Sequence, residues 1–274
     1  AESECTTRPG FVVLASRGVE IAYTELVTEA ATLPLPEESP PLKALKDHRI
    51  VGKRHNTVDA LDIVTGRSKY GIDTRQPDMR YAVIARAPVL NATVKRIDDT
   101  AARKIKGVLD VFEIQGPAMG EPYQILASGV AVVAPSTWIA MKGRDALTIE
   151  WHESPSATDN SDDFWRQNSD LLEGDGQIVL DDGDFPSAMA AAKTAIKHSY
   201  RVPFVSHAPL EPQNCYAYVQ KDRCHIIAPT QIPSGASRAA AAVTGLPRDQ
   251  IHVEMTRVGG GFGRRLTNDY VAEA

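Results

Sequence analysis

The sequence IHVEMTRVGGGFGRR, residues 251–265, holds the pattern that decides how the C-terminal part of this chain folds. Its first half alternates apolar and polar side chains, as a half-buried β-strand does, with Ile251, Val253 and Met255 on one face. Four glycines then fall within residues 259–263. Because glycine has no Cβ and adopts positive φ at little cost, the backbone here can approach another group closely. The stretch predicts either a tight turn between a strand and a helix, or a binding loop for an anion or an oxo group.

Several common motifs do not fit this loop. A dinucleotide-binding fold needs the spacing GxGxxG, with an acidic residue about 20 positions later. The loop instead reads GGGFG and ends at Gly263 of 274 residues. The sequence contains neither the GxxxxGK[ST] of a P-loop nor the GxSxG of a nucleophile elbow. A nicotinamide or ATP site is therefore not expected.

The composition indicates a globular protein of one or two domains. The 274 residues are 43% hydrophobic and 24% charged. A net charge of −5, without a long basic run, argues against a general nucleic-acid binder. No apolar run approaches the roughly 20 residues of a membrane span, and the opening AESECTTRPG is unlike a signal peptide. Because the first residue is not Met, we expect a processed chain or a piece of something longer.

The cysteines and histidines are too scattered for a metal centre held by this chain alone. Cys5, Cys215 and Cys224 form no CxxC pair, which argues against a four-cysteine zinc site or iron–sulfur cluster. Cys215 and Cys224 lie in apolar runs and are expected to be buried thiols. The histidines form neither HxxxH nor HExxH. His207 and Glu211 could form an acid–base couple, but the prolines around them favour a structural hydrogen-bonding role for both.

The order of predicted helices and strands indicates an α+β fold. Residues 20–31 suit a short helix capped near Thr24, and the proline-rich residues 32–45 suggest an extended connector. From about residue 51 to 151 the chain alternates between strands and helices. The predicted strands are MRYAVIARAP, VLDVFEI, GVAVVA and LTIEW, and the predicted helices are DDTAARKIKGV, which ends at Gly107, and PSTWIAMKGRDAL, which has proline in its first turn.

The second half of the chain is predicted to contain further helices and one hairpin. SPSATDNSDD (154–163) is predicted to be a loop and EGDGQIVLDDGD (173–184) a series of turns. The acidic DDGD lacks the alternating ligands of a calcium loop, so Asp184 is expected to cap the next helix instead. The remaining predicted elements are helices at FPSAMAAAKTAIKHS, at SGASRAAAAVTGLP from a serine cap to Gly245, and at YVAEA, and a hairpin at NCYAYVQKDRCHIIA that turns at 221–223.

Three stretches of the second half, VSHAPLEPQNCYAYV, APTQIP and RVGGGFGRRLTNDYVAEA, together resemble the molybdenum hydroxylase (xanthine dehydrogenase/aldehyde oxidase) family. The similarity is to its molybdopterin-binding large subunits, in the branch of isoquinoline 1-oxidoreductase and membrane-bound aldehyde dehydrogenase. Three further parts of the chain agree with that branch: VGKRHNTVDALDIVTGRSKYGIDTRQPDMRYAVIARAP, GVAVVAPSTWIAMKGRDAL, and SECTTRPGFVV with AYTELV. GGGFG alone would be a weak signal, and HAPLEP and PTQ upstream of it make the resemblance specific.

The resemblance implies an α+β fold in which an α/β-hammerhead domain precedes the first part of a molybdenum-cofactor-binding domain. It also implies a molybdopterin-dependent oxidoreductase that oxidises an aldehyde or N-heteroaromatic carbon, with water as the oxygen source. The expected divisions are an N-terminal connector segment (1–49), the hammerhead domain (50–152), a linker (153–185) and the partial cofactor-binding domain (186–274).

The same resemblance implies cofactors and partners. The cofactor is molybdenum-molybdopterin, in its cytosine dinucleotide form, and [2Fe–2S] clusters on a small subunit take the electrons. The other expected partners are the remaining part of the molybdenum subunit, a cytochrome c or other electron acceptor, and a small-molecule substrate. A nucleic-acid partner is not expected. The implied location is periplasmic, with the cytoplasm as the alternative.

The resemblance also assigns cofactor-binding residues. The family's PTQ-type glutamine, which hydrogen-bonds an oxo ligand of molybdenum, carries over onto Gln231. The GGGFG backbone, which approaches the pterin and the metal's oxygen ligands, carries over onto Gly260, Gly261, Phe262, Gly263 and the Arg264 amide. No side chain is expected to bind the metal directly. The Phe262 ring could also wall the substrate channel. Arg264 and Arg265 could bind a pterin phosphate or a partner's carboxylate, with surface ion pairs as the alternative.

No residue of this chain is predicted to be the catalytic base. In the family that base is a glutamate far downstream of the glycine loop, so Glu211, Glu254 and Glu273 are not assigned to the role. Further glycine- and glutamine-rich cofactor segments of the family are also absent here. We therefore expect an internal portion of a longer subunit, or one chain of a split or cleaved enzyme, that is inactive without the rest and contacts it over a large surface.

Two alternatives from other classes remain. One is a non-catalytic assembly or interaction module that has kept the hammerhead fold, against which the retention of Gln231 with GGGFG argues. The other is a nucleotide-binding enzyme whose glycine loop binds phosphate. The absence of downstream acidic and lysine partners argues against that second alternative.

Overall fold

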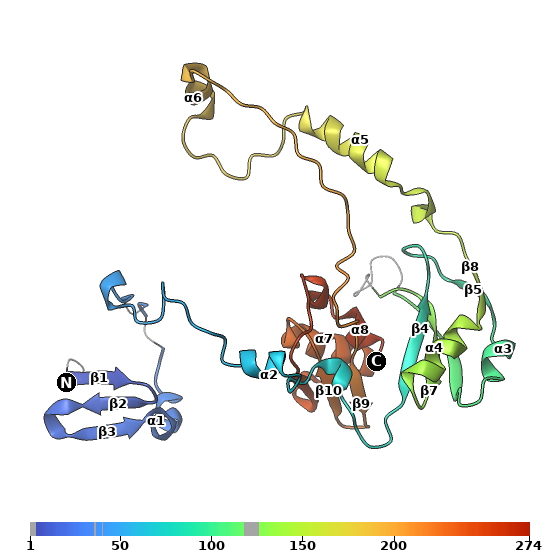
Figure 1. Cartoon of the computed structure of the whole chain (residues 1–274), viewed down its shortest axis with the longest axis horizontal. Coiled ribbons are helices and arrows are strands. Elements are labelled where there is room, and N and C mark those ends of the chain that lie inside the picture. The colour runs from blue at the N-terminus through green and yellow to red at the C-terminus, as the bar shows by residue number, and fades with distance from the viewer. Residues whose placement is uncertain (1–3, 36, 40, 118–125) are drawn as a thin grey trace. The chain divides into compact units, whose positions relative to one another are not determined.

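The computed structural model describes residues 4–35, 37–39, 41–117 and 126–274. The chain has an α+β composition and divides into two compact units, Ala1–Val58 and Asp59–Ala274 (Figure 1). Within the described ranges no helix combines the length and the apolar character that crossing a bilayer requires.

The first unit is a small antiparallel sheet followed at once by a helix. Its strands follow each other in the order β1-β2-β3, and the Arg8 and Glu20 side chains form an ion pair on it. The predicted cap at Thr24 is wrong, because Ala22 leaves the last strand in an extended conformation and is itself the N-cap. The elements are β1 (Cys5–Arg8), β2 (Phe11–Leu14), β3 (Val19–Ala22) and α1 (Tyr23–Ala30).

The second unit begins with two antiparallel sheets packed around a buried central strand. That strand lies between its two neighbours in the order β4-β7-β6, and β5 pairs with β8. All the strands predicted between residues 51 and 151 are confirmed. The elements are α2 (Ala60–Val64), β4 (Tyr81–Arg86), β5 (Val94–Asp98), α3 (Thr100–Arg103), β6 (Asp110–Ile114), β7 (Gly129–Ala134), α4 (Thr137–Asp145) and β8 (Thr148–Trp151).

Two helix ends in this region differ from the prediction. The helix α3 ends at Arg103 with Lys104 as its C-cap, so the prediction of Gly107 is wrong, although Gly107 does take a positive φ of 100° in the turn that follows. Proline does not lie in the first turn of α4 either. Ser136 comes between, and its hydroxyl accepts the Ile139 N–H at 3.4 Å as a side-chain N-cap.

Residues 153–215 contain two helices, and the first was not predicted. The acidic residues expected to lie in a loop form the first turn of α5, because the Asn160 side chain caps the N–H of Asp163 at 3.0 Å. The second helix ends at Ala191, before its predicted end, and exposes all its residues, so no packing supports a longer helix. Its predicted cap is confirmed, since Asp184 accepts the Ser187 N–H at 3.0 Å. These helices are α5 (Ser161–Leu172) and α6 (Phe185–Ala191).

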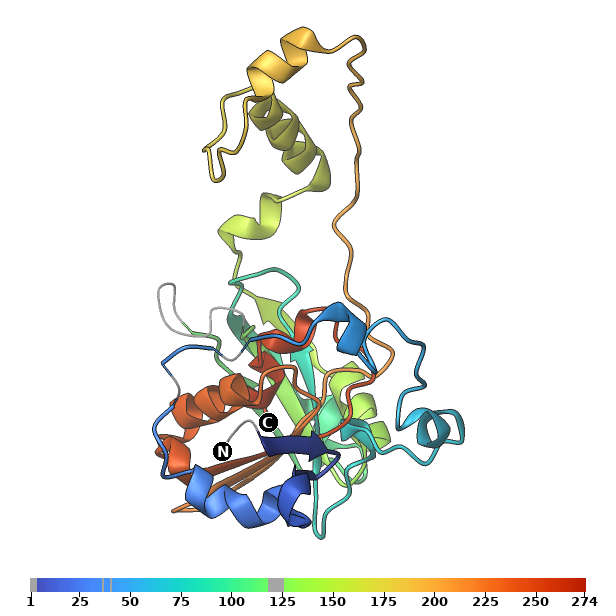
Figure 2. The same cartoon turned by 90° about the vertical axis from the view of Figure 1, so that its left-hand side faces the viewer.

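The C-terminal part of the second unit is a three-stranded sheet with two helices on one face (Figure 1 and Figure 2). The predicted hairpin is confirmed: β9 and β10 are antiparallel, and the Gln220 N–H donates to the Arg223 carbonyl at 2.8 Å across the turn. The third strand runs parallel to β10, and α7 connects the two. The elements are β9 (Tyr216–Val219), β10 (Cys224–Ala228), α7 (Pro233–Thr244), β11 (Ile251–Met255) and α8 (Asp269–Ala272).

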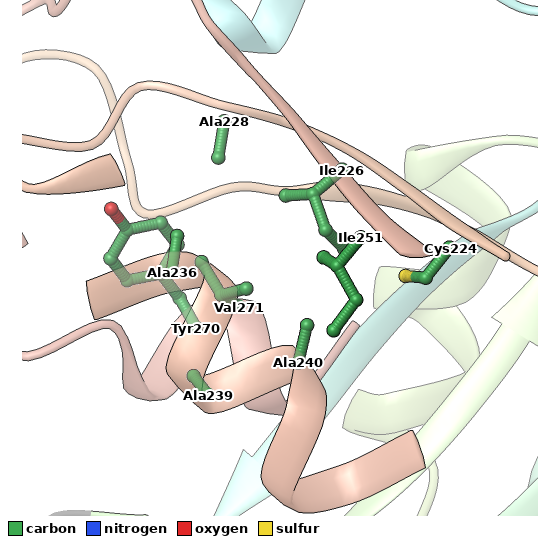
Figure 3. Packing of buried hydrophobic residues seen from close by; sticks show 9 residues of the cluster. All are labelled: Cys224, Ile226, Ala228, Ala236, Ala239, Ala240, Ile251, Tyr270 and Val271. Carbon is green, nitrogen blue, oxygen red and sulfur yellow. The ribbon is translucent and has the colours of Figure 1, made fainter. Parts of the chain in front are cut away.

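The predicted end of α7 at Gly245 is confirmed, with a left-handed φ of 72°, whereas its N-cap is Ile232 and not a serine. Small residues on α7 let it pack closely onto the sheet. Figure 3 shows the resulting core, in which the strand side chains meet the two helices. Met255 is exposed, so only Ile251 and Val253 of the predicted apolar face are turned toward the core. The core residues are Cys224, Ile226, Ala228, Ala236, Ala239, Ala240, Ile251, Tyr270 and Val271.

Short 3-10 helices complete the described structure. They lie at Ala15–Arg17, Leu45–Asp47, Gly71–Asp73, Pro155–Thr158, Arg248–Gln250 and Arg264–Leu266.

Candidate functional site

The candidate site lies where two parallel strands end at the same edge of the sheet. Strand β10 continues into Gln231, and β11 continues into the glycine loop, residues 259–263. Because the carboxyl ends of parallel strands meet at one edge, the two segments come together there. The Thr256 N–H donates to the Ala228 carbonyl at 3.2 Å and extends the pairing beyond β11. The sheet topology therefore joins two motifs that lie apart in the sequence.

The Gln231 side chain lies directly over Gly261. A Cβ built on Gly261 would be 2.6 Å from the Gln231 Oε1 and 2.9 Å from its Cδ. Gln231 is exposed, so its amide lies beside the loop and is open to a ligand. The absence of a side chain at position 261 thus leaves the space that the Gln231 amide occupies.

The backbone of the loop has the conformation of a binding loop. Gly260, Phe262 and Gly263 all take positive φ, at 99°, 53° and 91°. For a phenylalanine this conformation is strained, and strained residues cluster where ligands bind. The Phe262 ring is 75% exposed. Among the described residues, the N–H groups of 260–263 donate to no acceptor, whereas the Arg264 N–H closes a turn by donating to the Gly261 carbonyl at 2.8 Å.

The buried side chain of Glu211 binds the start of the glycine loop. Its buried carboxylate accepts the Gly259 N–H at 2.7 Å, the Ile72 N–H at 3.0 Å and the Asn214 side-chain amide at 2.9 Å. The structural role expected for Glu211 is therefore confirmed. His207 is exposed, and no hydrogen bond joins it to Glu211 among the described residues, so the two do not form an acid–base couple.

Arg265 is buried behind the loop, which the sequence did not reveal. Its side chain is fully inaccessible, and its Nε donates to the Gly260 carbonyl at 2.8 Å. Its Nη2 donates to the Glu211 carbonyl at 2.7 Å and lies 3.4 Å from the Glu211 carboxylate. Its Nη1 has no partner among the described residues. A buried arginine with its charge facing a buried glutamate matches neither expectation from the sequence, a phosphate ligand or a surface ion pair.

Arg264, by contrast, forms an ion pair at the edge of the loop. Its two terminal nitrogens each lie 2.6 Å from one carboxylate oxygen of Asp269. Burial opposes the charge of Asp269, but the hydrogen bonds from Arg264, with a smaller contribution from Thr267, outweigh it and lower the pKa of that carboxyl. The pair ties the end of the loop to the first turn of α8.

This pair predicts a pH dependence of stability. Because the pKa of Asp269 is lower in the folded chain than its ordinary value of about 3.9, its stabilising effect is complete above about pH 4 and is lost as the pH falls through the folded-state pKa. Asp269→Asn should therefore destabilise the protein by roughly 2 kcal/mol at pH 7. Thermal melts from pH 7 to pH 3 should show the difference between wild type and variant shrinking once the pH falls below about 4, and a constant difference would contradict the assignment.

Cys215 and Cys224 lie in or against the core next to this site and are not part of its chemistry, whereas Cys5 is exposed in the first unit. Cys224 is buried in the sheet, and burial, with the nearby Cys224 thiol, raises the pKa of Cys215 to about 12. A thiol with that pKa stays protonated at neutral pH and is a poor nucleophile. The prediction of buried thiols is confirmed for Cys224, and Cys215 is partly buried. Among the described residues, no three histidine, cysteine, aspartate or glutamate side chains lie close enough together to hold a metal ion.

Comparison with known proteins identifies a matching domain model and several similar proteins. Residues 171–274 match the family model of the molybdopterin cofactor-binding domain. The chain is 28% identical to membrane-bound aldehyde dehydrogenase (pyrroloquinoline-quinone) of Gluconacetobacter polyoxogenes over 99% of its own length and 35% of that protein. It is also 28% identical to isoquinoline 1-oxidoreductase subunit beta of Brevundimonas diminuta over 85% of this chain and 30% of the relative.

The fold is similar to that of a solved enzyme. Quinoline 2-oxidoreductase from Pseudomonas putida 86 superimposes with a TM-score of 0.52, at 21% identity, over 76% of this chain and 30% of that one. The chain thus spans about a third of the length of each of these proteins. Residues 171–274 thus match a molybdopterin cofactor-binding domain, and the chain as a whole is similar to molybdopterin-dependent oxidoreductases of the molybdenum hydroxylase family.

Proposed function

We propose that this chain supplies the loop that holds the oxygen ligands of a molybdenum cofactor in an oxidoreductase. The observation that carries the proposal is the position of the Gln231 amide over Gly261, beside the row of N–H groups of residues 260–263 that have no protein acceptor among the described residues. Such donors suit a group rich in anionic oxygen. The family resemblance assigns six residues to the cofactor, and all of them lie at this edge of the sheet, with the Gln231 side chain next to Gly261. They are Gln231, Gly260, Gly261, Phe262, Gly263 and Arg264.

The residues present fit such a cofactor. The positive φ values at positions 260, 262 and 263 are of the kind found where backbone N–H groups gather around an anion. The Arg264 amide is already used within the turn, so the donors available to a ligand are the Gln231 amide and the N–H groups of 260–263. The Arg264 side chain is held by Asp269, so we assign it to shaping the loop and not to binding phosphate.

When bound, the cofactor would supply two-electron oxidation chemistry at carbon, with water as the oxygen source. The role of this chain is to stabilise negative charge that develops on an oxygen at the loop. Donors that are already fixed in place need no reorganisation when the charge appears, which is why such groups contribute strongly to catalysis. The exposed Phe262 ring lies next to these donors in sequence, and we assign it to the wall of the substrate channel, where a flat ring can orient an aldehyde or heteroaromatic substrate.

The names of the relatives support the substrate class. One acts on an aldehyde by name and another on isoquinoline, so we propose an aldehyde or N-heteroaromatic substrate. Five further proposals rest on the family resemblance alone. They are the cytosine dinucleotide form of the cofactor, the [2Fe–2S] clusters on a second subunit, the remaining part of the molybdenum subunit, a cytochrome c acceptor and a periplasmic location. The assignment of residues 50–152 to a hammerhead domain is also a proposal, which the sheet β4-β7-β6 with α4 packed against it supports.

The test is a metal and cofactor analysis of the native complex that contains this chain. We expect about one molybdenum per chain, together with a released pterin dinucleotide. One relative carries pyrroloquinoline-quinone in its name, so the same extract should be assayed for that quinone. A complex from molybdate-supplied cells that lacks molybdenum, or one that holds the quinone in its place, would overturn the proposal.

A further inference from the structure

We propose that Glu211 and Arg265 are positioning residues that fix the donor groups of the glycine loop at the cofactor. This inference rests on the proposed function, since it names what holds the same site in place. Both side chains are buried, Arg265 fully so. Both act through the backbone of residues 259–263.

The two residues anchor the loop at both of its ends. At the start, the Gly259 N–H donates to the Glu211 carboxylate, and the Gly259 carbonyl accepts the Glu211 N–H at 3.1 Å. At the end, Arg265 reaches back to the Gly260 carbonyl and to the Glu211 carbonyl. The loop is therefore closed into a ring on a single residue, Glu211. The apex of the loop, residues 260–263, carries the N–H groups that have no acceptor among the described residues.

The conformation of the apex needs such an anchor. A phenylalanine with a φ of 53° persists only where the surrounding structure determines its backbone more strongly than its own preference does. Phe262 is exposed, so its side chain does not supply that constraint. Local backbone hydrogen bonds support only the end of the loop, where the Arg264 N–H donates to the Gly261 carbonyl and the Leu266 N–H donates to the Gly263 carbonyl at 3.1 Å. The ion pair between Arg264 and Asp269 fixes the end of the loop from outside, and the bonds made by Glu211 and Arg265 fix its start and the Gly260 carbonyl.

The burial of this pair also points to a role beyond stability. Burying two charges is costly, and replacing a buried ion pair by well-packed apolar residues is often neutral or favourable for folding. Here the Arg265 Nη1 lacks a partner among the described residues, which adds to the cost. An arginine, however, offers a rigid fork that reaches two carbonyls at once, which an apolar side chain does not. The geometry therefore indicates that the Glu211–Arg265 pair serves to position the loop and not to add packing energy.

Glu211 further couples the loop to a distant segment. The oxygen that does not bind Gly259 accepts the N–H of Ile72, 139 positions earlier in the sequence. The neighbouring Gly71 packs so closely that a Cβ on it would lie 2.5 Å from the Pro229 ring and 2.6 Å from the Asn214 side chain. A shift of the carboxylate would therefore move both the loop and its contact with residues 71–73.

The test compares Glu211→Gln and Arg265→Lys in the native complex. Glu211→Gln keeps the shape of the side chain but places an amide N–H donor where the carboxylate accepts from the Gly259 and Ile72 N–H groups. Arg265→Lys keeps the positive charge but loses the guanidinium that donates to two carbonyls at once. The matched control is Arg86→Gln, which breaks another ion pair of the same unit, with Glu273, without touching the loop. Two readouts are needed: amide hydrogen exchange in a peptide covering residues 259–264, and the rate at which the pterin is released.

We expect both variants to speed exchange of the loop amides about tenfold or more, while peptides from α7 and β10 keep their protection. Pterin release should become about 10- to 100-fold faster, as for other residues that orient the groups around a metal. The control should keep wild-type values for both. Loss of protection throughout the sheet would show a merely structural role and overturn the inference. Molybdenum-loaded variants with unchanged exchange and release would overturn it and leave the proposed function standing, whereas a wild-type complex without molybdenum would overturn both.

Discussion

Gly259→Ala is expected to destabilise the protein by about 3 kcal/mol, because the new methyl group would overlap with the Glu211 side chain. A Cβ on Gly259 would lie 2.5 Å from the Glu211 Cβ and 3.0 Å from its Oε2. The first of these atoms is attached to the backbone, so no rotamer change relieves the overlap. The main chains must separate instead, and the paired hydrogen bonds between Gly259 and Glu211 would be lost with them. Urea or thermal denaturation of the purified complex measures the loss.

A second glycine provides the control for that experiment. A Cβ on Gly176 would meet no atom within 4 Å, and this glycine does not take a positive φ, so Gly176→Ala should stay within about 0.5 kcal/mol of wild type. If Gly259→Ala also unfolds at the wild-type midpoint, the close packing of the loop onto Glu211 is wrong.

Gly261→Ala is expected to do the opposite, with little loss of stability and a large loss of activity. The atoms that a Cβ would meet are the far end of the exposed, flexible Gln231 side chain, which can swing aside. The fold then tolerates the change, but the amide is no longer held beside the loop. Under the proposed function, removal of one fixed donor lowers kcat roughly 10²- to 10³-fold. Activity with an aldehyde or N-heteroaromatic substrate should fall by that factor while the melting temperature stays within about 3 °C of wild type.

The dependence on Gln231 can be tested directly. If Gly261→Ala acts by displacing that amide, then Gln231→Ala should lower kcat by a similar factor, and the double variant should be no slower than either single one. Additive losses would show that the two residues act separately. Gly176→Ala again serves as the control, since its added methyl meets no neighbour.

The opposite outcomes expected at positions 259 and 261 follow from what each glycine faces. The first faces the stem of a buried side chain that is anchored to two segments, and the second faces the tip of an exposed one. The loop thus has a fixed base and an adjustable side chain above it.

Much of the fold could be predicted from local sequence because local physics decides it. The strands at 81–86, 110–114, 129–134 and 148–151 alternate or run apolar over a few residues, and the hairpin at 216–228 has a polar turn between two such runs. Gly245 and Asp184 occupy caps for which few residue types are suited. Helix ends without such signals were predicted poorly: α3 and α6 end early, and α5 begins in a polar stretch that resembles a loop.

Local sequence is enough to locate the motifs of the candidate site, whereas the contacts between these motifs depend on the fold. The glycines and Gln231 indicate close approach and polar binding, since those residue types have few other reasons to occur in that pattern. The pairing of Gln231 with Gly261 depends on two strands being parallel neighbours, and the Glu211–Arg265 pair joins residues 54 positions apart. Glutamate and arginine are usually exposed, so nothing in their local sequence marks them for burial. Only the folded chain brings their opposite charges together behind the loop and makes that burial possible.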